Sequence, residues 1–256
     1  MRVVLLGQGI AYSASPAIQN AAFRAAGLGG WSYELCDVPP SELAGAVDAL
    51  RRPDVAGANV TIPYKVAVMD LLDEVDARAR EVGAVNTIVR TGGRLAGHNT
   101  DLDGIAAAAR EVGFAGGEVV VLGAGGSARA VAGALPTARV TWVARDPRRA
   151  AGLAPVLAWD DAAWRRAARG AALLVQATPL GRGGELPVEP DDIPAHGGVI
   201  DLVYVAGGTP LVRAARERGR PVADGWTVLV EQGAAAFELW TGRTAPREAM
   251  RAAQPA

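Results

Sequence analysis

The sequence predicts an α/β protein made of two domains, each containing a sheet. Short apolar runs alternate with longer helix-compatible stretches, which is typical of this class. The 256 residues suffice for one large domain or two small ones. A strand, a glycine-rich turn and a helix follow one another from Glu118 onward, and this pattern opens a nucleotide-binding βαβ unit in many α/β proteins.

The first series of elements is expected between residues 2 and 98. We expect strands at 2–6, 31–36, 55–62, 84–90 and 94–98, and helices at 15–26, 41–50 and 65–81. Pro16 is placed to open the first helix, and Ser41 to cap the second. Thr91-Gly92-Gly93 predicts the turn between the last two strands.

The second series begins near residue 102. We expect helices at 103–112, 127–135, 148–157 and 209–218, and strands at 118–122, 140–144, 171–177 and 198–204. Gly219 is suited to a left-handed helix cap. A last long helix at 228–240 has no strand after it, so we expect it to return to the first domain. The predicted domains are therefore residues 1–101 with 226–256, and residues 102–225.

Composition excludes several classes of function. The formal net charge is −1, which is not the basic balance of a nucleic-acid-binding protein. One cysteine and two distant histidines argue against a disulfide framework or a metal cluster. No apolar run reaches the roughly 18 residues of a membrane span, and Gly7 interrupts the first apolar run early. We expect a cytoplasmic protein without nucleic-acid or membrane partners, and a homodimer stays an open option.

The glycine-rich turn predicts a dinucleotide site in a Rossmann-type domain. Gly123 permits the tight turn, Gly125 and Gly126 let a pyrophosphate approach the backbone, and Ala128 allows close packing of helix on strand. Ala124 and Ser127 complete the segment that would line the phosphates. The alternative is a tight βα turn without a ligand.

The end of the next predicted strand selects the cofactor. NAD sites place an acidic residue there, roughly 20 residues after the turn, whereas this chain has Ala144-Arg145 followed by Arg149. Arg145 and Arg149 can pair with a 2′-phosphate, which favours NADP, with NAD as the weaker alternative. Asp146 could cap the following helix or reach a ribose hydroxyl.

Lys65 stands out by count. Of the 26 basic residues, 25 are arginines and Lys65 is the single lysine. Lysine can give up its proton near neutral pH, which arginine effectively cannot, so Lys65 is a candidate for proton exchange. The alternative is a sampling accident in an arginine-rich chain.

Four polar turns concentrate in the first half of the chain. They lie at 12–16, 57–65, 84–87 and 97–104. Each by itself is typical of an ordinary turn. Together they suggest a site for a small, hydroxyl-rich, anionic substrate.

The order of these motifs resembles that of the shikimate dehydrogenases from about Gly7 to Gly242. The motifs are Ser13-x-Ser15-Pro16, Asn59-Val60-Thr61-Ile62-Pro63-Tyr64-Lys65, Gly83-Ala84-Val85-Asn86-Thr87, Asn99-Thr100-Asp101, Gly123-Ala124-Gly125-Gly126, Asp201-x-Val203-Tyr204, Glu231-Gln232 and Phe237-Glu238-Leu239-Trp240-Thr241-Gly242. The resemblance implies a substrate domain and an NADP-binding domain. It also implies reversible reduction of 3-dehydroshikimate to shikimate, a step in aromatic amino acid biosynthesis.

The same resemblance implies roles for individual residues. Lys65 and Asp101 would form the catalytic pair, in which Lys65 exchanges the proton and Asp101 orients both Lys65 and the ring hydroxyl of the substrate. Ser13 and Ser15 would hold the substrate carboxylate. The remaining polar contacts to the substrate would come from Thr61, Asn86, Tyr204 and Gln232, while Leu202 and Gly225 would lie beside the nicotinamide.

Several positions depart from the pattern of the family. They are Tyr12, Gln19, Ala144, Asp146, Ala206 and Thr227-Val228. These departures leave open the choice among shikimate, quinate and an amino analogue, and the strictness for NADP. A dehydrogenase of relaxed cofactor use is therefore the second interpretation. A non-catalytic NADP-binding sensor is a remote one, because Lys65 and Asp101 are both present.

Overall fold

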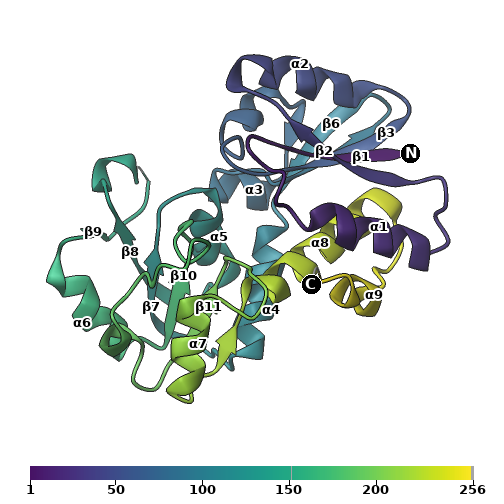
Figure 1. Ribbon diagram of the computed structural model, residues 1–256. Coiled ribbons are helices and arrows are strands. Elements are labelled where there is room, and N and C mark those ends of the chain that lie inside the picture. Colours follow the sequence, from purple (N-terminus) through teal and green to yellow (C-terminus); the bar gives the residue numbers. More distant parts are fainter. Residues whose placement is uncertain (151, 255–256) are drawn as a thin grey trace. The chain divides into compact units, whose positions relative to one another are not determined.

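Two compact units make up the chain. The computed structural model describes residues 1–150 and 152–254, and these form one unit of residues 1–101 with 230–256 and a second of residues 102–229. Each unit contains one six-stranded sheet (Figure 1). The mixed α/β class predicted from the sequence is therefore correct.

The first unit has a mixed sheet of order β2-β1-β3-β5-β6-β4. Its strands are β1 (Arg2–Gly7), β2 (Ser32–Asp37), β3 (Val55–Val60), β4 (Glu74–Val75), β5 (Thr87–Thr91) and β6 (Arg94–His98). β1 pairs in parallel with β2 and β3, whereas β5 runs antiparallel to both β3 and β6. Gly92 and Gly93 have φ angles of 60° and 85° in the β5–β6 hairpin, a conformation that favours glycine.

Helices cover both faces of this sheet (Figure 1). They are α1 (Ser15–Ala25), α2 (Leu43–Asp48), α3 (Ala77–Val82), α9 (Arg247–Ala252) and the part of α8 (Gly225–Thr241) that belongs to this unit. On the α2 face, Val47 packs into a core with Val60 and Ile88. On the α1 face, Phe23 packs against Phe237 of α8 at 5.6 Å between ring centroids. From Val230 onward, α8 packs with the first half of the chain.

The helix expected at 65–81 is wrong. The chain forms a 3-10 turn (Ala67–Leu71), then β4, then α3. Asp73 accepts the Leu95 N–H at 2.7 Å, and Asp76 caps α3 by accepting the Ala79 N–H at 2.6 Å. These tertiary and capping bonds override local helix propensity.

The helix expected at 41–50 is only partly correct. It consists of α2 between the 3-10 turns Pro40–Glu42 and Ala49–Arg51. Ser41 lies inside the first turn and does not cap α2. Pro40, which fixes its own φ and has no N–H, occupies the first position of that turn.

The second unit has an all-parallel sheet of order β12-β11-β10-β7-β8-β9. Its strands are β7 (Gly117–Leu122), β8 (Ala138–Ala144), β9 (Val156–Ala158), β10 (Leu173–Gln176), β11 (Gly198–Asp201) and β12 (Val222–Ala223). Read from β9, this is the strand order 3-2-1-4-5-6 of the Rossmann fold. Such a fold binds its ligands in a crevice outside the carboxyl ends of the strands. In this sheet the crevice is expected between β7 and β10, where the strand order reverses.

The helices of this unit are α4 (Asp101–Glu111), α5 (Gly126–Ala134), α6 (Ala162–Gly170) and α7 (Pro210–Glu217), together with the first residues of α8. Trp164 of α6 and Leu211 of α7 share a core with Val120 and Leu174 of the sheet. Thr209 caps α7, and Gly219 after it has a φ of 65°, as expected.

The helix expected at 148–157 is also wrong. A 3-10 turn (Pro147–Arg149) is followed by β9; Ala151 lies outside the described residues. Gly152 has a φ of 81°, and Pro155 has no N–H for a helix, while its carbonyl accepts the Trp142 N–H at 3.0 Å. The sequence pattern also failed to predict α6, α9 and β12.

Candidate active site

Lys65 and Asp101 form an ion pair in the first unit. The Lys65 Nζ lies 2.6 Å from the Asp101 Oδ2, and the two side chains are 14% and 10% exposed. A charge pair this well shielded from water interacts more strongly than one on the surface. The sequence analysis placed these two residues together, and the structure brings them into contact across 36 positions of chain.

The end of β3 positions Lys65. A turn closed by the Tyr64 N–H and the Thr61 carbonyl at 2.9 Å follows the strand. The buried Tyr64 hydroxyl donates to the Val38 carbonyl at 2.6 Å, and the Lys65 carbonyl accepts the Val85 N–H at 2.7 Å. The backbone of Lys65 is therefore fixed from both sides.

Asp101 begins α4 at the end of β6. Its N–H donates to the side chain of Asn99 at 3.1 Å, and the Asn99 amide donates to the Ala84 carbonyl at 2.8 Å. Asn86 donates from Nδ2 to the Asp101 Oδ1 at 2.8 Å. Asp101 thus accepts a hydrogen bond from Asn86 on one oxygen and from Lys65 on the other.

Gln232 of α8 extends this group of side chains. Its Oε1 lies 3.4 Å from the Asn86 Nδ2 and 3.5 Å from the Thr100 Oγ1, both long hydrogen-bond distances. Lys65, Asp101, Asn86 and Gln232 therefore come together in one unit.

Ser13 and Ser15 form a second polar group at the start of α1. Their hydroxyls lie 3.2 Å apart, and the Ser15 N–H donates to the Ser13 Oγ at 3.2 Å.

Thr61 is half-buried, and a Cβ on Gly7 would lie 2.6 Å from the methyl group of Thr61, so glycine is required at that contact.

The glycine-rich turn of the second unit joins β7 to α5. Gly123 has a φ of 114°, and a Cβ there would lie 3.0 Å from the Ala177 carbonyl oxygen. Gly125 precedes α5 in extended conformation, with open space where a side chain would be. Ala124, Gly126 and Ser127 are half-buried around it. A glycine-rich turn before a helix N-terminus is an arrangement that suits a phosphate group.

The arginine segment follows β8. Ala144 is buried and Arg145 is exposed; the side chain of Arg149 lies outside the described part of the structure. The Asp146 Oδ1 accepts the Arg148 N–H at 3.1 Å, so Asp146 caps the 3-10 turn. The Arg148 guanidinium also donates to both oxygens of Asp146, at 2.9 and 3.1 Å. Capping, one of the two roles that the sequence left open for Asp146, is therefore present in the structure.

Three predicted residues lie near the end of β11 in the second unit. Tyr204 packs edge-on against Trp226 at 6.4 Å, and the Arg182 guanidinium lies 5.7 Å from its ring centre. Leu202 is half-buried two residues before it. Gly225 is buried, and a Cβ there would lie 2.5 Å from the Val203 carbonyl carbon, so only glycine allows this approach.

Asp201 at the end of β11 is the most strongly perturbed acid of this region. Burial raises the pKa of Asp201 to about 6, against the hydrogen bonds that the Thr209 hydroxyl and the Val203 N–H donate to it. Asp224 adds a like-charge contribution in the same direction. The bonds from Thr209 and Val203 to Asp201 support the backbone before Tyr204.

Four buried polar residues that connect to Asp101 through Asn86 had no predicted role of their own. They are Tyr33, Asn59, Thr87 and Thr100. Three of them stand inside the motifs quoted above, and Tyr33 appeared only as part of a strand. Asn59, a polar side chain inside a fully buried strand, carried a signal that could have found it, whereas a threonine or a tyrosine in a strand is ordinary.

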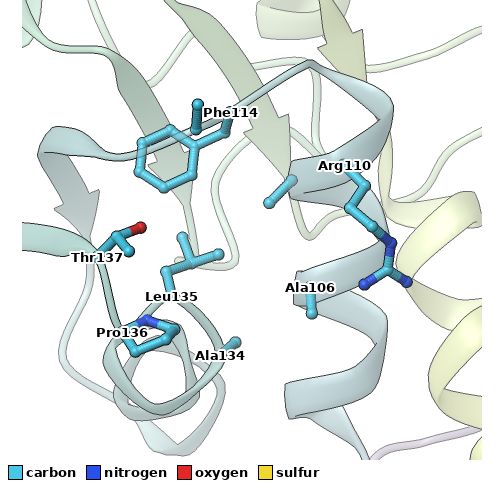
Figure 2. A pocket seen from close by; sticks show the side chains of 9 residues that line it. Ala106, Arg110, Phe114, Ala134, Leu135, Pro136 and Thr137 are labelled. Atoms are coloured by element: carbon cyan, nitrogen blue, oxygen red, sulfur yellow. The ribbon is translucent and has the colours of Figure 1, made fainter.

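A pocket of about 180 Å³ lies elsewhere in the second unit, between α4 and the end of α5. Figure 2 shows Phe114 and Leu135 on one side of it and α4 on the other. None of the predicted site residues lines it, and Arg110 is its single charged side chain. We assign no chemistry to this pocket.

Residues 1–150 and 152–254 contain neither a candidate metal centre nor a candidate membrane span. No three acidic, histidine or cysteine side chains there are arranged to hold a metal ion. In the same residues, none of the helices has the length and apolar character needed to span a membrane.

Comparison with known proteins places the chain in a family. Residues 5–88 match the model of the shikimate dehydrogenase substrate binding domain, and residues 225–253 match that of the shikimate 5′-dehydrogenase C-terminal domain. The shikimate dehydrogenase (NADP(+)) of Symbiobacterium thermophilum is 46% identical over 97% of this chain and 92% of its own length. That of a Thermus thermophilus strain is 42% identical over 94% and 93%.

The comparison with solved structures gives the same family as the sequence comparison. A shikimate 5-dehydrogenase of Thermus thermophilus, in complex with NADP(H) and shikimate, has a TM-score of 0.87 at 37% identity and covers 99% of this chain and 98% of its own. The Listeria monocytogenes enzyme, in complex with shikimate and NAD, has a TM-score of 0.86 at 28% identity, over 98% and 95%. With this identity over nearly its whole length, the chain belongs to the shikimate dehydrogenase family.

Proposed function

We propose that the protein catalyses the reversible, NADPH-dependent reduction of 3-dehydroshikimate to shikimate in aromatic amino acid biosynthesis. The observation that carries the proposal is the shielded pair of Lys65 and Asp101 at 2.6 Å, with Asn86 bonded to the same carboxylate. An amine and a carboxylate held together out of water suit proton exchange at an alcohol or carbonyl oxygen.

Lys65 is the residue that moves the proton in this proposal. In the reduction it donates a proton from Nζ to the carbonyl oxygen as that oxygen becomes a hydroxyl. In the oxidation it takes the hydroxyl proton back. Asp101 orients the amine through Oδ2 and is itself held by Asn86 through Oδ1. A positioned acid or base of this kind contributes about 10²–10⁴-fold to a rate.

The substrate is held by hydroxyls and amides from several elements. Ser13 and Ser15 donate to its carboxylate, since their two hydroxyls stand 3.2 Å apart at a helix N-terminus. The ring hydroxyls meet the remaining polar side chains, which are Thr61, Asn86, Tyr204 and Gln232. Because hydroxyls and amides can both donate and accept, this set suits a polyhydroxylated acid.

NADP fits the second unit. When bound, it supplies a hydride to the carbonyl carbon or accepts one from the alcohol. The turn Gly123–Ser127 would hold its diphosphate, because Gly125 leaves open space before α5. Arg145 and Arg149 would hold the 2′-phosphate, and Ala144 would border the adenosine. Leu202 and Gly225 would border the nicotinamide.

These roles assign most of the substrate contacts to the unit of residues 1–101 with 230–256, and the NADP contacts to residues 102–229, which also contain Tyr204. The proposal includes a cytoplasmic enzyme that acts on a small molecule and needs no nucleic acid. Its oligomeric state, monomer or homodimer, is a question for sedimentation at enzyme concentrations.

The test is an absorbance assay for NADPH formation with purified protein. Shikimate and quinate are each supplied with NADP and with NAD. Rapid turnover of shikimate with NADP is the expected result. Preferential turnover of quinate, or equal use of NAD, supports the relaxed dehydrogenase instead. NADP binding without turnover of either acid would contradict the proposal and point to a sensor.

A further inference from the structure

A chain of buried polar side chains leads from β2, an edge strand of the first sheet, to the catalytic pair. Its members are 0–5% exposed and come from strands β2, β3 and β5 and from the end of β6; they are Tyr33, Asn59, Thr87, Asn86 and Thr100. Burying such groups costs folding free energy unless every one is hydrogen-bonded. The reaction proposed above uses only Asn86 among them.

Main-chain groups fix the orientation of the two side-chain amides in this row of hydrogen-bonded residues, those of Asn59 and Asn86. The Asn59 Nδ2 lies 3.1 Å from the Asn86 carbonyl, which can only accept. The Asn86 Oδ1 lies 2.7 Å from the Thr100 N–H, which can only donate. Both amide orientations therefore follow from the backbone.

The Thr87 hydroxyl stands at the junction of the two amides. It accepts from the Asn59 Nδ2 at 3.0 Å, since that atom is a donor. Its own proton can then go to the Asn86 Oδ1 at 3.0 Å. The Thr100 hydroxyl also lies 3.0 Å away, and either of these two hydroxyls can donate to the other. One hydroxyl thus links the side chains of three other residues.

The hydrogen bonds therefore all run in one direction, from the Tyr33 hydroxyl toward Asp101. Tyr33 donates to the Asn59 Oδ1 at 2.8 Å, Asn59 donates to Thr87, and Thr87 donates to Asn86. With its oxygen occupied, Asn86 presents its amide N–H to the Asp101 Oδ1 at 2.8 Å. Each member sits in the low-dielectric interior, where such bonds reinforce one another.

We propose that Thr87 is a positioning residue for the reaction: its hydroxyl holds the Asn86 amide so that Asp101, and through it Lys65, keeps its productive placement. Tyr33 is the outer end of the same chain. This inference rests on the proposed roles of Lys65 and Asp101. It concerns residues that touch neither reacting atom.

The test compares two changes at one position. Thr87→Val keeps the shape but removes the hydroxyl, and Thr87→Ser keeps the hydroxyl. We expect Thr87→Val to lower kcat for shikimate about tenfold, since small displacements of catalytic groups cost rates of this size, with KM for shikimate and the dissociation constant of NADPH within about twofold of wild type. Thr87→Ser should restore kcat to within about threefold of wild type.

Tyr33→Phe gives an independent measurement if Thr87→Val folds poorly. Because it removes the most distant donor and leaves the Asn59 amide bonded to the Asn86 carbonyl, kcat should fall about twofold to threefold. Val47→Ala is the control for stability alone: Val47 is 2% exposed in the α2 core. It should lower Tm without changing kcat per folded molecule.

The possible outcomes distinguish a failure of the proposed function from a failure of the role proposed for Thr87. A wild-type protein inactive on shikimate would contradict the proposed function together with this inference. An active wild type whose Thr87→Val variant keeps its kcat, or whose serine variant falls as far as the valine variant, would contradict the role of Thr87 and leave the function standing. If Val47→Ala lowered kcat per folded molecule as far as Thr87→Val does, lost stability would explain both drops, and the role of Thr87 would be contradicted.

Discussion

The two units place their polar groups in opposite ways. In the first, the polar side chains are inside the sheet: Asn59, Asn86 and Thr87 are buried between strands and bonded to one another. In the second, the buried core is mainly apolar, with Gln176 and Asp201 as buried polar side chains at the ends of β10 and β11, and the candidate cofactor contacts include a glycine turn and the exposed Arg145. Chemistry at defined atoms needs fixed side chains, whereas holding a diphosphate needs mainly backbone N–H groups and charge.

This contrast predicts where substitutions act. Changes in the first unit should alter turnover and leave cofactor affinity intact. Changes at the arginines of the second unit should alter cofactor affinity and leave the chemistry intact. The expected effects below run from the largest to the smallest.

Lys65→Ala should lower kcat about 10²–10⁴-fold, because it removes the proposed proton-exchanging group. NADPH binding, followed by fluorescence, should stay within about twofold of wild type. Lys65→Arg is the matched variant: it keeps a positive charge beside Asp101 but cannot release a proton. It should be inactive too. Near-normal turnover in either variant would remove Lys65 from its proposed role.

Asp201→Asn should raise stability in neutral solution. Folding raises the pKa of Asp201 from 3.8 to about 6, so the folded state holds its proton more tightly than the unfolded state does. The free energy of unfolding therefore falls as the pH rises from about 4 through 6, by about 3 kcal/mol in all. The asparagine variant lacks this loss, so above pH 7 it should unfold at higher urea concentration than wild type.

Asp192→Asn is the control for that experiment. Asp192 is equally buried but pairs with Arg165 at 2.6 Å and with Arg169 at 2.8 Å. Neutralising it leaves two arginines without their partner, so this variant should be less stable than wild type. If Asp201→Asn destabilises the protein at pH 8 as well, the burial of the Asp201 charge is not the dominant effect.

Arg145→Ala should raise KM for NADP about tenfold and spare KM for NAD, because it removes the proposed charged hydrogen bond to the 2′-phosphate. Arg139→Ala is the matched control. Arg139 is an exposed arginine at the opposite end of β8, paired with Glu118 at 2.6 Å, and its loss should change neither constant. Equal weakening of both cofactors by Arg145→Ala would refute the phosphate contact.

Arg148→Ala should have the smallest effect. It releases the Asp146 carboxylate, which then repels a 2′-phosphate and can accept from a ribose hydroxyl. The ratio of NADPH to NADH dissociation constants should rise about twofold to fivefold, the size typical of an exposed ion pair. In an Asp146→Asn background, the same substitution should change the ratio little. An equal change in both backgrounds would mean that Arg148 acts by its own charge.

Much of the fold could be predicted from local pattern. The run before Gly123 is apolar and continuous because β7 is buried on both faces, and the hairpin glycines Gly92 and Gly93 take the φ angles that their turn needs. The pattern failed where tertiary bonds decide: Asp73 and Asp76 end a helical stretch by bonding to backbone N–H groups. It also failed at Pro155, which was expected in the interior of a helix.

The candidate site was predicted unevenly. Lys65 is visible by its rarity alone, and its pairing with Asp101 came from the order of motifs. Thr87 gave no such signal, because a threonine in a strand is ordinary, and its importance comes from three partners at 3.0 Å that only the fold assembles. Sequence pattern identifies residue types suited to chemistry, but not the residues that hold them in place.

The scarcity of lysine has a practical consequence. Apart from the amino terminus, the chain offers a single primary amine to an acylating reagent, and that amine is mostly enclosed and engaged by a carboxylate. The rate at which this amine is modified, followed by mass spectrometry, therefore reports whether the salt bridge between Lys65 and Asp101 is intact, and no substrate is needed. Ligands that shield the amine will slow the labelling, and variants that loosen its partner will hasten it.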